Sequence, residues 1–151
     1  MRISAKIDYA LRACTELALA GDGPMKGERI AEAQGIPIKF LERILSELRN
    51  AGIVGTQRGV DGGYWLARPA GEITLADVMR AVEGPLANVR GQRPETLRYT
   101  GSAASVAELW IAVRASLRTV LEATSVGDLA SGALPEHVRE LAAAPEAWHS
   151  H

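Results

Sequence analysis

Apolar positions between residues 38 and 51 recur with the 3.6-residue period of an α-helix. The apolar stripe consists of Leu41, Ile44, Leu45 and Leu48, and the opposite, polar stripe consists of Lys39, Arg43, Ser46 and Asn50. Because an apolar stripe of this width docks a helix on a core, the polar stripe faces solvent or a ligand. A row of hydrogen-bond donors suits a helix that reads the DNA major groove, although any amphipathic surface helix can carry such a row.

The residues before this helix predict a second helix joined to it by a tight turn. Residues 28–34 form a short helical pattern with Ile30, Ala31 and Ala33 available for packing. Gly35 supplies a stop for this helix, and Pro37 fits the first turn of the next one. Two helices joined by a tight turn that contains glycine are the arrangement of a helix-turn-helix.

A β-hairpin is predicted directly after the helix pair. Residues 53–58 are rich in β-branched side chains, residues 59–63 form a glycine-rich turn, and residues 64–67 return before Pro69 ends the pairing. An isolated hairpin is only marginally stable in water. We therefore interpret it as a wing that lies along DNA, with Arg58 and Arg68 positioned to contact phosphates. The alternative is a hairpin that only covers the core.

The rest of the chain is predicted to be helical. An N-terminal helix has Ile3, Ile7, Leu11, Cys14 and Leu17 on one side, and its regularly spaced charges argue against an export signal. Thr74 can cap a short helix that runs to Val82, and Gly84-Pro85 then breaks the chain. A long helix is predicted to begin near Ser105, whose spacing to Glu108 is that of a capping box.

The long helix carries an apolar seam that we predict to be a dimerisation surface. It consists of Val106, Leu109, Trp110, Val113, Leu117, Val120 and Leu121. This seam is longer than a small winged-helix core requires, so part of it is expected to pack on a second copy. A symmetric dimer would place two recognition helices about 34 Å apart and would favour an inverted-repeat operator. The alternative is packing of this helix over the first helix of the same chain.

These elements predict a mainly α fold with a small β-hairpin wing. Residues 1–85 are expected to form a winged helix-turn-helix DNA-binding domain, 86–102 a loop, 103–130 a dimerisation helix region and 131–151 a C-terminal tail. Within the tail, Pro135 and Pro145 bracket a short predicted helix.

Composition adds modest constraints on function. The chain has 151 residues, 47% of them apolar, and a net charge of −1. A near-neutral charge gives little support for nucleic-acid binding, so dimerisation would be needed to assemble enough phosphate contacts. A single cysteine excludes an internal disulfide and fits a cytoplasmic protein. No apolar run approaches the roughly 18 residues of a membrane span. No phosphate-binding loop, nucleophile elbow or metal-ligand spacing suggests an enzyme.

Several blocks of the sequence resemble one regulator family. They are residues 1–6, 9–12, 35–45, 58–64 and 73–78. In this order they are similar to bacterial winged helix-turn-helix regulators of the IscR, NsrR and CymR type, also called Rrf-type regulators. The resemblance covers roughly residues 1–130. It implies a homodimeric transcription factor, usually a repressor, that binds palindromic promoter DNA through its recognition helix and wing.

The resemblance also suggests which residues contact DNA. It assigns base reading and backbone positioning to Pro37, Lys39, Phe40, Glu42 and Arg43, and minor-groove entry to Arg58. We add Arg49, Gly62, Gly63 and Tyr64 as candidate contacts of the same surface. Phe40 replaces a tyrosine that is common in relatives, and Arg43 replaces a frequent glutamine. An arginine at this position could favour guanine.

The loop before the long helix bears on how such a regulator would sense its signal. Cluster-binding relatives place three cysteines in the loop before the long helix, whereas residues 86–102 contain none. Asp8 occupies a ligand position used by some relatives, but one carboxylate cannot hold an iron-sulfur cluster. We therefore expect no cofactor.

Three hypotheses for sensing remain. Cys14 could be a redox switch, although a buried thiol is usually inert. A cluster held by carboxylates with His137, His149 and His151 is less favoured, because these histidines lie near the C-terminus. A small molecule or partner protein could bind between the winged domain and the long helix, near residues 90–99, Trp65 or Trp110, although tryptophans usually serve packing. A winged helix that only binds proteins is the rival function.

Overall fold

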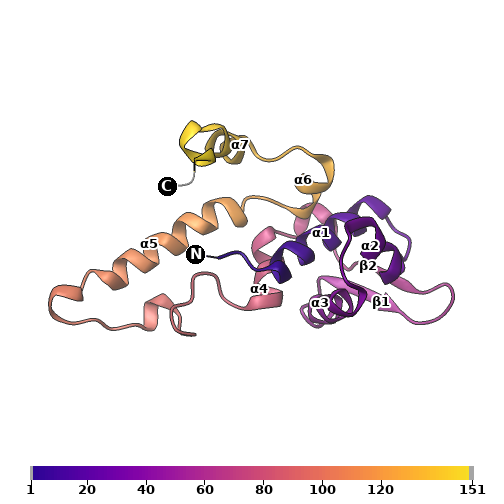
Figure 1. Cartoon of the computed structure of the whole chain (residues 1–151), viewed down its shortest axis with the longest axis horizontal. Helices are drawn as coiled ribbons and strands as arrows, with labels where there is room; N and C mark the ends of the chain where they lie inside the picture. The colour runs from indigo at the N-terminus through magenta and orange to yellow at the C-terminus, as the bar shows by residue number, and fades with distance from the viewer. Residues whose placement is uncertain (1, 150–151) are drawn as a thin grey trace.

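The computed structural model describes residues 2–149, so His151 lies outside the described part. The chain forms a winged body, an arm that extends from it and a C-terminal segment that folds back over the arm (Figure 1). The body contains α1 (Ala5–Ala20), α2 (Gly27–Gln34), α3 (Ile38–Asn50), β1 (Val54–Gln57), β2 (Gly63–Leu66), α4 (Leu75–Glu83) and α6 (Val126–Ser131). The arm is α5 (Val106–Leu121), and the C-terminal segment contains α7 (Glu136–Ala143). This confirms the prediction of a mainly helical chain with one small hairpin.

Helix α1 occupies the centre of the body. The Ser4 hydroxyl caps it by accepting a hydrogen bond from the Ile7 amide at 3.2 Å. Ala10, Ala13 and Leu17 are buried on the side that contacts α3, α4 and α6. Small side chains at this contact let the neighbouring helices approach closely, so one helix supports three others.

Lys6 joins three helices at one end of the body. Its ammonium group donates a hydrogen bond to the Val82 carbonyl on α4 at 2.6 Å and pairs with the Glu47 carboxylate on α3 at 2.6 Å. Both partners are charged or strongly polar and the site is only partly exposed, so these bonds are stronger than those of a surface pair. They fix the orientation of α3 relative to the core.

Helices α4 and α6 begin side by side, and each has a capping box. Thr74 and Asp77 form the box of α4, which confirms the predicted cap, and Ser125 and Asp128 form that of α6. The Leu75 amide donates to the Thr124 carbonyl at 2.9 Å, and the Val126 amide donates to the Ile73 carbonyl at 2.8 Å. Residues 103–130 therefore hold two helices, and the second of them is built into the winged body.

Helix α5 leaves the body as a single layer (Figure 1). None of its residues is fully buried within the chain. The capping box predicted at Ser105 is wrong: Ser105 has helical backbone angles, and its side chain makes no capping bond. The box needs an extended N-cap residue, whereas the chain already turns helically at Ala104.

The segment from residue 86 to residue 105 runs below α5 and contains two short 3-10 turns, Pro94–Thr96 and Gly101–Ala103. Leu86, Pro94 and Leu97 anchor it through buried side chains. Helix α7 confirms the short helix predicted between Pro135 and Pro145. His137 ties it to the arm through a contact of 2.9 Å between its Nε2 and the Thr119 carbonyl. Among residues 2–149, no helix combines the length and apolarity that crossing a bilayer requires.

Candidate nucleic-acid interface

The turn between α2 and α3 is fixed by backbone hydrogen bonds. Gly35 adopts a left-handed conformation, with a φ of 61°, and its amide caps α2 at Ala31 and Glu32. The Ile36 amide donates to the Ala31 carbonyl at 2.9 Å, and the Ile36 side chain is buried. The Pro37 carbonyl accepts from the amides that begin α3. This rigid turn sets the angle at which α3 leaves the body.

Helix α3 has one fully buried face and one exposed face. The buried face consists of Leu41, Ile44, Leu45 and Leu48, and the exposed face includes Lys39, Glu42, Arg43, Ser46, Arg49 and Asn50. The side chains of Lys39 and Arg43 are 91% and 76% exposed. Their pairings with Glu42 at 3.6 Å and Glu47 at 3.7 Å are solvated, so they contribute little and can be exchanged for contacts with DNA.

Phe40 is tied to α1 at the start of this exposed face. Its ring packs edge to face against the Tyr9 ring, with centroids 5.6 Å apart at 84°. The Arg12 guanidinium covers the Tyr9 ring at 5.2 Å and also donates to the Gln34 side chain at 3.0 Å. Phe40 therefore links α1 to α3, and 37% of its surface remains available to a ligand. This role was not evident from the sequence.

The wing is attached to the body at its base. Strands β1 and β2 pair antiparallel from Val54–Leu66 to Gln57–Gly63. Met25 and Tyr64 exchange two backbone hydrogen bonds of 2.8 Å, which adds the chain before α2 to the edge of the wing. The Lys26 ammonium donates to the Gly59 carbonyl in the turn at 2.5 Å. These contacts hold the wing in a fixed position relative to α3.

The wing residues proposed to contact DNA lie in different environments. Arg58 is exposed beside the turn, Tyr64 packs half-buried against the core, and Gly62 and Gly63 are buried at the base of the turn. A Cβ at position 63 would lie 2.6 Å from the Met25 carbonyl oxygen. The glycines thus allow close approach of two backbones, whereas Arg58 can reach outward. Arg68 pairs instead with Asp77 of α4 at 3.6 Å.

Helix α5 carries the apolar seam predicted for dimerisation. Its seven seam residues are half-buried or exposed in the isolated chain, and Leu109 is 54% exposed. The Trp110 Nε1 is buried and has no hydrogen-bond partner among residues 2–149. The neighbouring Ile111, outside the predicted seam, is 42% exposed. The helix therefore presents apolar surface beyond what its own chain covers.

Cys14 and the histidines within residues 2–149 were the candidate sensor residues that the structure describes. Cys14 is fully buried, and desolvation raises the pKa of its thiol to about 12, so the thiol stays protonated and unreactive at neutral pH. This argues against the redox-switch hypothesis. No group of three histidine, cysteine, aspartate or glutamate side chains within residues 2–149 could hold a metal. An iron-sulfur cluster needs several thiolates, so the donor set of this chain does not fit one.

Sequence reasoning missed a group of arginines between the body and the arm. Arg80 of α4 lies near Arg93 of the 86–102 segment and near Arg114 and Arg118 of α5. The four-residue spacing of the last two on one helix was the only local signal. The sequence predicts an effector site between the winged domain and the long helix near residues 90–99, and this pocket lies in that region. Trp65 and Trp110, named for the same site, do not line it.

Comparison with known proteins agrees with this architecture. The family model described as "Rrf2: Iron-dependent Transcriptional regulator" matches residues 3–132. A candidate HTH-type transcriptional regulator of Mycobacterium tuberculosis, Rv1287, is 50% identical over 143 residues, covering 94% of this chain and 89% of that protein. The HTH-type transcriptional regulator CymR of Bacillus subtilis is 38% identical over 132 residues, covering 87% of this chain and 91% of that protein.

Solved structures of transcriptional regulators are also similar to this chain. The structure of CymR, described as the global cysteine regulator of B. subtilis, superposes with a TM-score of 0.73 and covers 87% of this chain and 98% of that one. IscR of T. potens superposes with a TM-score of 0.69 at 30% identity and covers 100% of this chain and 93% of that one. The chain therefore belongs to the Rrf2 family of helix-turn-helix transcriptional regulators.

Proposed function

We propose that this regulator acts in the cytoplasm as a homodimeric repressor that binds palindromic promoter DNA. The observation that carries the proposal is the exposed polar face of α3, held rigidly beside the wing. Lys39 and Arg43 project from a helix whose opposite face is fully buried. Arg58 lies beside the wing turn. This combination can place one helix in the major groove and one arginine along the backbone or in the minor groove.

Dimerisation is supported by the apolar surface of the arm. An apolar groove of about 480 Å³ lies between α1, α4 and α5, lined in part by Ile3, Met79, Leu117 and Val120. Leu109 on the same helix is also exposed, and α5 has no fully buried residue, so its own chain leaves apolar surface of the arm uncovered. Exposed apolar surface of this extent is typical of interfaces, and a second copy of α5 has the matching chemistry.

The proposal is tested by fluorescence-anisotropy titration of the promoter of the regulator's own gene and of a scrambled duplex, each at two salt concentrations. We expect preference for the promoter and a steep loss of affinity with salt, because phosphate contacts release counterions. Arg43→Ala should cost about 1 to 3 kcal/mol and relax base preference. Arg139→Ala, on the exposed face of α7, is the matched control.

Equal, weak binding to promoter and scrambled DNA would remove the main support for this function. It would favour the rival interpretation of the winged body as a protein-interaction module. Retention of full promoter affinity by Arg43→Ala would show that α3 is not the reading element, even if the protein binds DNA.

A further inference from the structure

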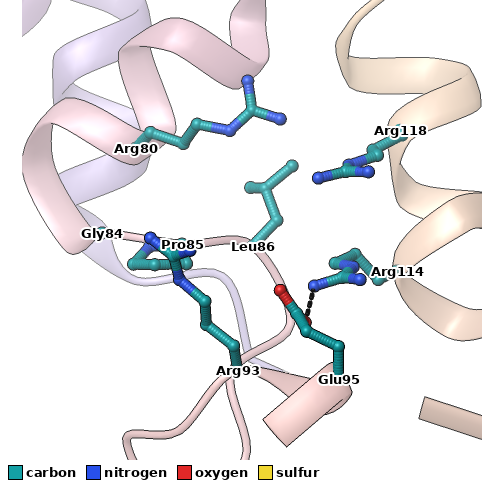
Figure 2. Close-up of a pocket in the computed structure, with 8 residues that line it drawn as sticks. All are labelled: Arg80, Gly84, Pro85, Leu86, Arg93, Glu95, Arg114 and Arg118. Atoms are coloured by element: carbon teal, nitrogen blue, oxygen red, sulfur yellow. Dashed lines mark hydrogen bonds and ion pairs between the residues drawn. The ribbon is translucent and has the colours of Figure 1, made fainter. Parts of the chain in front are cut away.

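A pocket of about 330 Å³ lies where the winged body meets the arm. Figure 2 shows side chains from three separate segments around it: α4, the loop that follows it, and α5. The lining residues are Arg80, Gly84, Pro85, Leu86, Arg93, Glu95, Arg114 and Arg118. Four guanidinium groups and a single carboxylate therefore share one concave surface.

The two arginines on the upper side of the pocket share one carboxylate. Arg80 forms an ion pair with Glu122, and the Arg118 Nε lies 3.5 Å from the same glutamate. Arg80 also approaches Asp77 at 4.0 Å. Asp77 also pairs with Arg68 at 3.6 Å, so Asp77 and Glu122 together face three arginines. This side of the pocket holds more positive charge than its own acids neutralise.

The lower side of the pocket also holds more positive charge than its carboxylate neutralises. Glu95 pairs with Arg114, whose side chain is only 16% exposed. Arg93 lines the same pocket with its guanidinium group beside Pro85 (Figure 2), and it has no ion-pair partner within residues 2–149. Arg93 is exposed to solvent, so its charge is largely solvated, and it stays free to bind an anion that the neighbouring arginines attract.

We propose that this pocket binds a small organic anion with at least two negative charges, such as a phosphate ester or a dicarboxylate. The planar guanidinium forks of Arg93 and Arg118 can each bind a carboxylate or phosphate through two parallel hydrogen bonds. Leu86 and Pro85 provide an apolar wall for a short carbon skeleton. A volume near 330 Å³ lies at the lower end of the range for metabolite sites.

Anion binding would have a structural consequence, and this consequence rests on the proposed DNA-binding function. The ligand bridges α4 of the body to α5 of the arm, and α5 has no fully buried residue to fix its direction. In a two-fold dimer joined through α5, the direction of the arm sets the separation of the two α3 helices. A ligand that favours one arm direction therefore changes the affinity for DNA.

Isothermal titration calorimetry tests the site directly. Citrate and pyrophosphate serve as the carboxylate and phosphate probes, with ionic strength held constant by chloride. We expect saturable binding of at least one probe. Absence of saturable heat up to about 10 mM, which corresponds to an affinity weaker than the millimolar range, would overturn the proposal.

Two variants with opposite expected effects separate ligand binding from a structural role. Arg93→Ala removes a cation with no protein partner and should weaken binding about tenfold, since one charge-assisted interaction is lost. Glu95→Gln removes the only lining carboxylate and should tighten binding. Arg139→Ala should leave the affinity unchanged. If Glu95→Gln weakened binding, or Arg93→Ala had no effect, the probe would not bind in this pocket and the proposal would be overturned.

The regulatory consequence is tested by repeating the promoter titration with saturating probe. We expect the probe to change wild-type affinity for the promoter and to leave that of Arg93→Ala unchanged. A probe that binds without affecting DNA affinity would overturn the coupling and leave the site intact. Failure of the unliganded protein to prefer its promoter would overturn the proposed function, while the calorimetric result would still decide the site.

Discussion

Cys14 illustrates how burial determines the chemistry of a single residue. The thiol lies on the buried face of α1, and desolvation raises its pKa from 9.0 to about 12. In the unfolded chain it ionises near its ordinary pKa. Below pH 9 both states hold the proton and stability is unaffected. As the pH rises from 9 towards 12, only the unfolded state loses its proton, so the free energy of unfolding falls.

We predict that the wild-type protein loses more stability than Cys14→Ala between pH 8 and pH 10, by about 1 kcal/mol. Comparison within this pair cancels the titration of tyrosines and lysines that both proteins share. Urea unfolding at the two pH values measures the difference. Identical losses in the two proteins would mean that the thiol is accessible to solvent and that the redox hypothesis has to be reconsidered.

Gly63 shows a different constraint, imposed by the close approach of two backbones. Its φ is 155°, and a Cβ would lie 2.6 Å from the Met25 carbonyl oxygen. We predict that Gly63→Ala destabilises the wing attachment and lowers the free energy of unfolding by about 1 to 3 kcal/mol. Urea denaturation monitored by circular dichroism measures this free energy. Gly71→Ala is the control, because a Cβ there meets nothing within 4 Å. Similar stability of both variants would contradict the tight contact.

At the scale of elements, α6 belongs to the body although the arm precedes it in the sequence. Val126 is fully buried, and its amide bonds to Ile73. We predict that Val126→Ala lowers the free energy of unfolding by about 1 to 3 kcal/mol, because it leaves a cavity in the core. Val138→Ala, at a half-buried position on the otherwise exposed α7, should have a smaller effect, measured in the same unfolding experiment. If Val138→Ala lowered the free energy of unfolding more than Val126→Ala, α6 would lie outside the core.

The elements differ in how far the sequence predicts them. Periodicity was sufficient for α3 because four leucine and isoleucine residues lie on one face and charged residues on the other, and Gly35 and Pro37 mark its start. The glycine-rich turn at residues 59–63, between two strand-like segments, likewise predicted the wing. Periodicity could not predict the docking of α6, since Val126 finds its partners on α1 and at Ile73. An effector site between the winged domain and the long helix was predicted, but its arginine cluster was not, because residues 80, 93, 114 and 118 meet only after α4 and α5 pack.

At the scale of the whole molecule, the arm should determine the oligomeric state. Leu109 is 54% exposed in the isolated chain. We predict that Leu109→Glu shifts the protein from dimer to monomer, because it would bury an unpaired charge in the interface. Light scattering coupled to size-exclusion chromatography measures the mass. Leu141→Glu, at a residue on α7 that is 57% exposed, should leave the dimer unchanged. A Leu109→Glu protein that stays dimeric would place the interface elsewhere.

The proposed function requires a two-fold clamp in which α5 holds two copies of α3 about one DNA turn apart. The decisive measurement is an anisotropy titration of two versions of the operator, one intact and one with five base pairs inserted between its half-sites. The insertion rotates one half-site by about half a turn, so a rigid dimer can read only one of them. We predict that the insertion lowers the affinity to that of a single half-site. Unchanged affinity would contradict the clamp.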